Sequence, residues 1–88
     1  MFGGLMEELE NVILLIDDAL NDSFASKNIK SCLEEAKKNL LKKDEDKSLR
    51  VSAAVYAIEK TVEDPNIASH MRIKLLNILS SLESIKQG

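Results

Sequence analysis

The segment Asp44-Glu45-Asp46-Lys47-Ser48 has residue types that could bind a metal ion. Acidic residues at alternate positions begin the twelve-residue calcium loop of EF-hand proteins. That loop also needs glycine at its sixth position and glutamate at its twelfth, where this chain has Leu49 and Val55. The segment is therefore predicted to be a solvated linker rather than a calcium site.

The only histidine, His70, and the only cysteine, Cys32, lack the partners that a zinc site or a catalytic dyad requires. We expect His70 at the surface near the start of a helix. We expect Cys32 to act as a small apolar side chain beside the core, with a reactive thiol as the alternative.

Carboxylates at Asp17, Asp18 and Glu59 could meet in a helical bundle, but di-metal bundles add Glu-x-x-His pairs, and the chain contains none. It also lacks a glycine-rich phosphate loop and a nucleophile elbow. The sequence therefore predicts no enzyme, no metal and no cofactor.

Charge is distributed unevenly along the 88 residues, although the net charge is only −3. Residues 1–26 carry six acidic groups and no basic group, whereas residues 27–50 carry eight basic and five acidic groups. The basic set is Lys27, Lys30, Lys37, Lys38, Lys42, Lys43, Lys47 and Arg50. It could pair with the acidic first segment and add solubility, or it could dock RNA or an acidic protein. The absence of interleaved aromatic residues favours the first interpretation.

Apolar residues recur at spacings of three and four, which predicts four helices at about residues 5–21, 27–42, 49–63 and 68–86. Ser26 is expected to cap the second helix, and Asp46 or Ser48 the third. The expected inward-facing residues are Leu5, Leu9, Val12, Ile16 and Ala19; Ile29, Leu33, Ala36 and Leu40; Val51, Ala54, Val55, Ile58 and Val62; and Met71, Leu75, Ile78, Leu82 and Ile85.

An offset of 42 residues relates the two halves of the chain. It pairs Asp22 with Asp64 and Lys30 with Arg72, so an aspartate precedes a basic residue by eight positions in both halves. Two repeats are too few for a stable open solenoid. We therefore predict one all-α domain over residues 1–88, a four-helix up-and-down bundle built from two similar helical hairpins.

Leu14 and Leu15 fall outside the inward stripe of the first helix. One interpretation is that this helix lies centrally in the bundle and buries apolar residues on several sides. The other is that the two leucines form an apolar patch for self-association or for a partner helix.

Three segments together resemble the small archaeal proteins of uncharacterised protein family 0147. They are Lys43-Asp44-Glu45-Asp46-Lys47-Ser48-Leu49-Arg50-Val51, Ala57-Ile58-Glu59, and Glu63-Asp64-Pro65-Asn66-Ile67 before Arg72. The resemblance covers nearly the whole chain. It implies a compact four-helix protein from an archaeal cytosol, with no assigned activity and hence no catalytic positions to transfer.

The turn formed by Asp64, Pro65 and Asn66, with Arg72 after it, is expected to be structural. It is also similar to the inter-helix turn of HEAT repeats, which implies a protein-interaction surface rather than catalysis. This chain has only two such units, and the first lacks both the proline and the arginine.

The start of the chain, Met1-Phe2-Gly3-Gly4, has no basic region, and the longest apolar run, from Val12 to Ile16, is far shorter than a membrane span. We expect a cytoplasmic protein that does not enter a membrane. The predicted function is non-catalytic binding of a protein partner or of a second copy. The alternative is a nucleic-acid or ribosome-associated accessory protein using the lysine-rich face of the second helix. The expected partner surface is Leu14, Leu15, Lys37, Lys38, Lys42 and Lys43.

Overall fold

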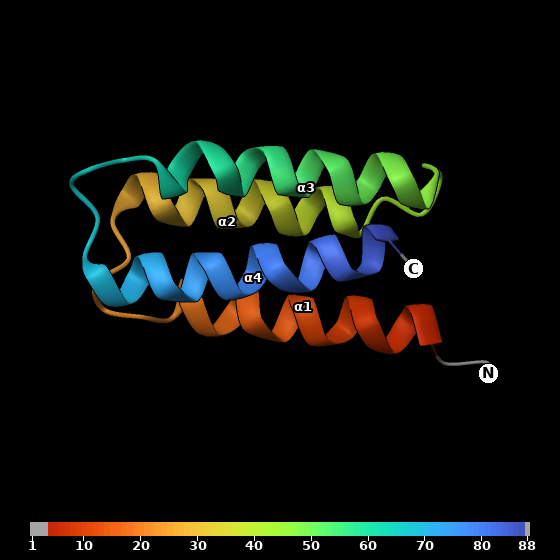
Figure 1. The fold of residues 1–88 in the computed structure, drawn as a ribbon, viewed down its shortest axis with the longest axis horizontal. Helices are drawn as coiled ribbons and strands as arrows, with labels where there is room; N and C mark the ends of the chain where they lie inside the picture. Colours follow the sequence, from red (N-terminus) through yellow and green to blue (C-terminus); the bar gives the residue numbers. More distant parts are fainter. Residues whose placement is uncertain (1–3, 88) are drawn as a thin grey trace.

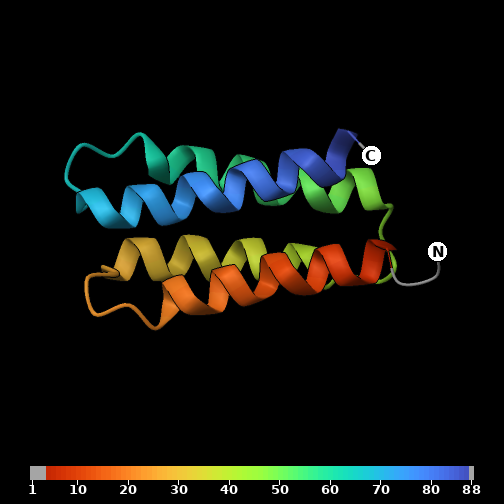
Figure 2. The same cartoon turned by 60° about the horizontal axis from the view of Figure 1, so that its bottom comes forward.

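Four helices, α1 (Gly4–Leu20), α2 (Lys27–Leu40), α3 (Lys47–Val62) and α4 (Ser69–Gln87), form the computed structural model in Figure 1. The structure describes the backbone of residues 4–87 and the side chains of residues 8–85. Each helix packs against its neighbours in the chain, and α4 returns to pack against α1. Figure 2 shows two layers, α1 with α2 and α3 with α4. The predicted four-helix up-and-down bundle of two hairpins is confirmed.

The α1–α2 and α3–α4 loops lie at one end of the bundle, and the α2–α3 loop lies at the other (Figure 1). The repeated hairpins therefore bring their equivalent turns together. In such a square arrangement no helix is central, because each contacts only two others. The interpretation of α1 as a central helix is accordingly wrong.

The core is built from the predicted stripes and contains only hydrophobic side chains within residues 8–85. Val62 is half-buried rather than buried, and Leu5 lies outside the described side chains. Ala57 is also buried, and Cys32 packs beside it with its Sγ donating to the Ala57 carbonyl at 3.1 Å. Small residues on α3 thus allow close approach to α2. The buried residues are Leu9, Val12, Ile16, Ala19, Ala25, Ile29, Leu33, Ala36, Leu40, Val51, Ala54, Val55, Ala57, Ile58, Met71, Leu75, Ile78, Leu82 and Ile85.

The second helix ends at Leu40, earlier than the predicted Lys42, and Arg50 binds the carbonyl at its end. Arg50 Nε and Nη2 both donate to the Leu40 carbonyl oxygen, the former at 3.1 Å. This charged fork satisfies a terminal carbonyl that no helical N–H can reach. The third helix begins at Lys47, before the predicted Leu49. Asp46 holds the N-cap position, but its side chain makes no capping hydrogen bond.

The turn between α3 and α4 uses the same device. Arg72 donates through Nε to the Val62 carbonyl at 3.3 Å and through Nη2 to the Asp64 carbonyl at 2.8 Å. Asp64 also accepts a hydrogen bond from the Asn66 backbone N–H at 2.9 Å. Arginine and carbonyl are ten residues apart here, as they are for Arg50. The α2–α3 and α3–α4 connections are therefore both held by an arginine from the following helix.

The α1–α2 turn keeps only part of this arrangement. Asp22 accepts from the Phe24 backbone N–H at 2.8 Å, as Asp64 does from Asn66, but Lys30 is exposed where the second half has Arg72. Ser26 caps α2 as predicted, because its hydroxyl accepts the Ile29 N–H at 3.2 Å. A serine cap thus fixes the start of α2 in the half that lacks the arginine.

Candidate interaction surfaces

An ion pair joins the outer sides of α1 and α2. Lys37 Nζ lies 2.8 Å from Asp17 Oδ1, and both side chains are about a third exposed. A pair this exposed contributes only about 0–1 kcal/mol, since solvent and salt screen it. Its value here is geometric, because it shows which residues of the two helices face each other.

Two exposed leucines lie close to that pair. Leu14 precedes Asp17 by three residues and Leu41 follows Lys37 by four, spacings that place neighbours on one side of a helix. Their exposed fractions are 65% and 51%. Because α1 and α2 are antiparallel, both leucines lie on the same side of the pair, towards the end of the bundle with the α2–α3 loop. We call Leu14, Asp17, Lys37, Lys38 and Leu41 the α1–α2 face.

The other predicted surface residues do not all join this face. Leu15, which is 39% exposed, lies on the α4 side of α1, between Asn11 and Asp18, which both face α4. Lys42 and Lys43 lie in the loop after α2 rather than in the helix, and Lys42 is 3.7 Å from Glu45. The structure therefore separates Leu15 from Leu14 and moves two lysines off the predicted helical face.

A polar cluster centred on Asp22 joins the α1–α2 loop to the start of α4. The Asp22 carboxylate is 2.8 Å from Lys74 Nζ and 3.0 Å from His70 Nε2. Lys74 Nζ is also 3.0 Å from Asp18 Oδ2. The Phe24 and His70 rings pack edge to face, with their centroids 4.9 Å apart. The cluster fastens the first hairpin to the second at the end where their equivalent turns meet.

These contacts shift two ionisation equilibria. The Lys74 ammonium, the Phe24 amide and the His70 ring hold the pKa of Asp22 well below its usual value of 3.8. Asp22 and Asp18 in turn raise the pKa of Lys74. Separately, burial raises the pKa of the Cys32 thiol, which therefore stays protonated at neutral pH and packs as a small apolar group.

Replacement of Asp22 by asparagine should lower the melting temperature most at neutral pH and least in acid. In the native state the Asp22 carboxylate stays ionised below the pKa it has in the unfolded chain. Its stabilising effect is therefore complete above about pH 5 and is lost as the pH falls through about 4 and below. Thermal unfolding followed by circular dichroism at pH 7, 4 and 2.5 would measure the difference from wild type.

Asp44→Asn is the matched control, because Asp44 is an exposed loop aspartate. Its difference from wild type should be small at every pH. A D22N difference that stayed constant from neutral to acid pH would contradict the proposed ionic contribution.

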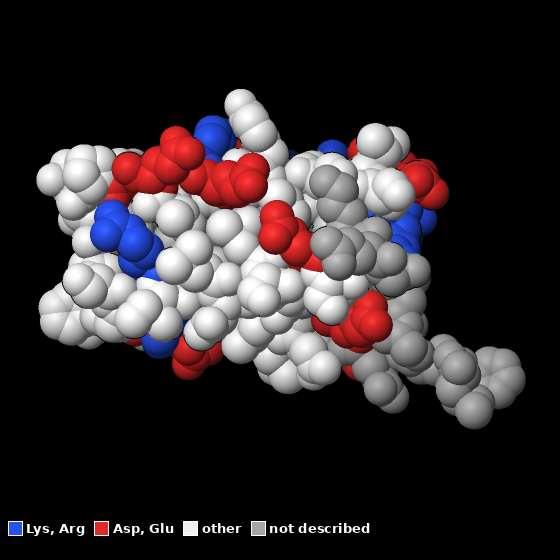
Figure 3. Space-filling view, in the orientation of Figure 1, with Lys and Arg blue, Asp and Glu red and all other residues white. Residues whose placement is uncertain are grey.

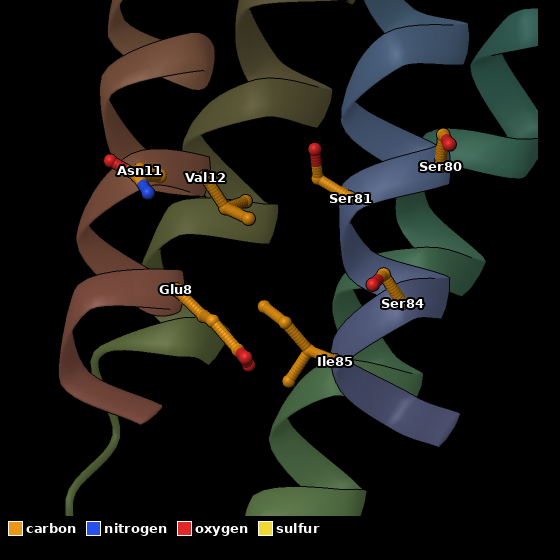
Figure 4. A pocket seen from close by; sticks show the side chains of 7 residues that line it. All are labelled: Glu8, Asn11, Val12, Ser80, Ser81, Ser84 and Ile85. Atoms are coloured by element: carbon orange, nitrogen blue, oxygen red, sulfur yellow. The ribbon is translucent and has the colours of Figure 1, made fainter. Parts of the chain in front are cut away.

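A hollow of about 340 Å³ lies between α1 and α4. In Figure 4, Glu8 reaches from α1 towards Ile85, and Ser81 points from α4 towards α1. Its lining is Glu8, Asn11, Val12, Ser80, Ser81, Ser84 and Ile85. Glu8 is the only acidic residue in this lining, which contains no histidine or cysteine. The hollow therefore offers shape and hydrogen-bonding groups rather than an acid–base pair.

Among residues 8–85, the polar cluster brings His70 and carboxylates together, but it does not form a metal site. No group of three or more His, Cys, Asp or Glu side chains there could hold a metal ion. His70 is committed to Asp22, and Cys32 to the Ala57 carbonyl. Among the described helices, none has both the length and the apolar character of a membrane span.

The fold defines a small all-α protein, a four-helix bundle with exposed apolar and charged side chains on its surface. The sequence pattern described as Uncharacterised protein family (UPF0147) matches residues 4–85, and the chain belongs to this family. The resemblance noted in the sequence is thus confirmed, and the family carries no assigned catalytic activity.

Relatives and solved structures agree with this assignment. A UPF0147 protein of Methanocaldococcus jannaschii is 34% identical over 80 residues, covering 91% of this chain and 86% of the relative. One from Pyrococcus horikoshii is 31% identical, covering 91% and 87%. A crystal structure of a UPF0147 protein from Thermoplasma acidophilum has a TM-score of 0.86 at 26% identity, covering 91% of this chain and 94% of the other. These three sources are archaea.

Several surface residues were not identified from the sequence. The exposed apolar side chains among them are Leu41, Ile73 and Leu76. Because these residues fall outside the inward stripes, the sequence could have indicated their exposure. The contact between Asp22 and His70 joins residues 48 positions apart. This contact forms only because the α1–α2 and α3–α4 turns lie at the same end of the bundle. The spacing of apolar residues does not predict that position.

Proposed function

We propose that this protein is a non-catalytic adaptor that binds another protein through its α1–α2 face. The observation that carries the proposal is the exposure of Leu14 and Leu41 beside the Asp17–Lys37 pair, both on the side towards the α2–α3 loop. Apolar anchors beside charged groups are typical of protein interfaces, in which a few large side chains supply most of the affinity.

The nucleic-acid alternative has weaker support from the same geometry. Lys37 and Lys42 each lie beside a carboxylate of the same chain, which offsets their charge towards phosphate. Lys38 and Lys43 remain exposed. The segment from Lys37 to Lys43 contains no aromatic residue on which a base could stack. A cytoplasmic location likewise stays a prediction.

A tagged pull-down from the source organism's lysate, with and without nuclease, tests the proposal. We expect a protein partner that survives nuclease and is lost with Leu14→Glu, because the substitution puts a charge at an apolar contact. Tyr56→Glu on α3 is the matched control, an exposed side chain outside the α1–α2 face, and should retain the partner.

Loss of every partner after nuclease treatment would overturn the proposal and favour the alternative. In that case Lys38→Glu should weaken binding, and affinity should fall steeply with salt concentration as counterion release predicts.

A further inference from the structure

The outward side of α4 differs between its two halves. Ile73 and Leu76 in the N-terminal half are 59% and 46% exposed and, three residues apart, lie on the same side of the helix. Ser80 and Ser84 continue that side into the C-terminal half, where they line the hollow beside α1 (Figure 4). One half of the helix thus presents large apolar side chains, and the other presents small ones beside a depression.

The residues on the outward side of α4, Ile73, Leu76, Ser80 and Ser84, carry no charge. Figure 3, with α4 towards the viewer, shows a broad uncharged area between separate clusters of acidic and basic groups. Leu15 of α1 is a further apolar residue on this side of the molecule. An uncharged centre with charge around it is the usual composition of a protein interface. We call Leu15, Ile73, Leu76, Ser80 and Ser84 the α4 face.

We propose that the α4 face binds a second copy of this chain, with the two α4 helices antiparallel about a two-fold axis. In a two-fold interface the same surface serves both partners, so it must be complementary to itself. An antiparallel arrangement places the N-terminal half of each α4 against the C-terminal half of the other. Ile73 and Leu76 of each copy then lie over Ser80, Ser84 and the hollow of the other copy.

The charges along α4 favour this direction. Arg72 and Glu83 are eleven residues apart, about three helical turns, and therefore lie on the same side of α4. The antiparallel arrangement brings Arg72 of each copy towards Glu83 of the other, which gives two attractive pairs. A parallel arrangement would instead bring Arg72 towards Lys74 of the second copy, since Lys74 lies on the α1 side of the helix.

The α1–α2 face plays no part in this contact, so the inference is independent of the proposed function.

Sedimentation equilibrium across a range of concentrations tests the inference. We expect wild-type protein to reach twice the chain mass of 9.8 kDa. Ile73→Glu should weaken dimerisation at least tenfold by placing a carboxylate in the apolar contact. Glu83→Lys should weaken it several-fold, because one substitution removes both cross-copy pairs. Leu14→Glu is the matched control on the α1–α2 face and should leave the dimer intact.

Two results would overturn the inference. One is a wild-type protein that remains monomeric at high-micromolar concentration. The other is a dimer that Leu14→Glu dissociates and Ile73→Glu does not, which would locate self-association on the α1–α2 face. Circular dichroism of each variant confirms folding, which both substitutions should preserve because both side chains are exposed.

Discussion

Truncation of Leu40 to alanine should lower the free energy of unfolding by about 3 kcal/mol, within the range of about 2–5 kcal/mol for buried leucines. The Leu40 side chain is fully buried at the end of α2, and its loss removes apolar contacts and leaves a cavity. Urea unfolding followed by circular dichroism would measure the change, and the midpoint should fall without a large change in slope.

The next residue provides the control. Leu41 has the same side chain but is half exposed, so Leu41→Ala should change the free energy of unfolding by no more than about 0.5 kcal/mol. Equal effects at the two positions would show that the packing at this end of the bundle is different from that described.

Replacement of Arg72 by alanine should cost about 2 kcal/mol, because charge-assisted hydrogen bonds contribute about 1.5–3 kcal/mol. The substitution leaves the carbonyls of Val62 and Asp64 without their side-chain donor. Arg72→Lys should recover only part of the loss, since an ammonium lacks the planar fork that reaches both oxygens. Measuring in the Ile73→Glu background would keep self-association out of the result.

The repeat supplies a matched control for this prediction. Lys30 occupies the equivalent position in the first half and is exposed, so Lys30→Ala should have little effect on stability. A cost for K30A as large as that for R72A would contradict the role assigned to the arginine.

Helical periodicity predicted the four helices, and the presence of only two repeats favoured a closed bundle over an open solenoid. The spacing of Met71, Leu75, Ile78, Leu82 and Ile85 identified the buried side of α4 completely, because only one side of a helix can face the core of a small bundle. Ser26 was recognisable as a cap because its preference acts within one helical turn. Such local rules require no knowledge of distant neighbours.

The surfaces were harder to predict, since they depend on which helices are adjacent. Leu14 and Leu15 are consecutive, yet one lies on the outward α1–α2 face and the other beside α4, because successive helical residues point about 100° apart. The carbonyl at the end of α2 is bound by Arg50, ten residues further along the chain. Contacts of this kind depend on how the helices are arranged in space, and helical periodicity alone does not predict that arrangement.

The positions of the chain ends have a consequence for the evolution and engineering of this fold. Gly4 and Gln87, the first and last described helical residues, lie at the end of the bundle that also holds the α2–α3 loop (Figures 1 and 2). Joining the termini and opening the chain at that loop would exchange the order of the hairpins while retaining every helix pair. The order of the two hairpins along the chain is therefore not fixed by their packing. A circular permutant opened at this loop should form the same four-helix bundle.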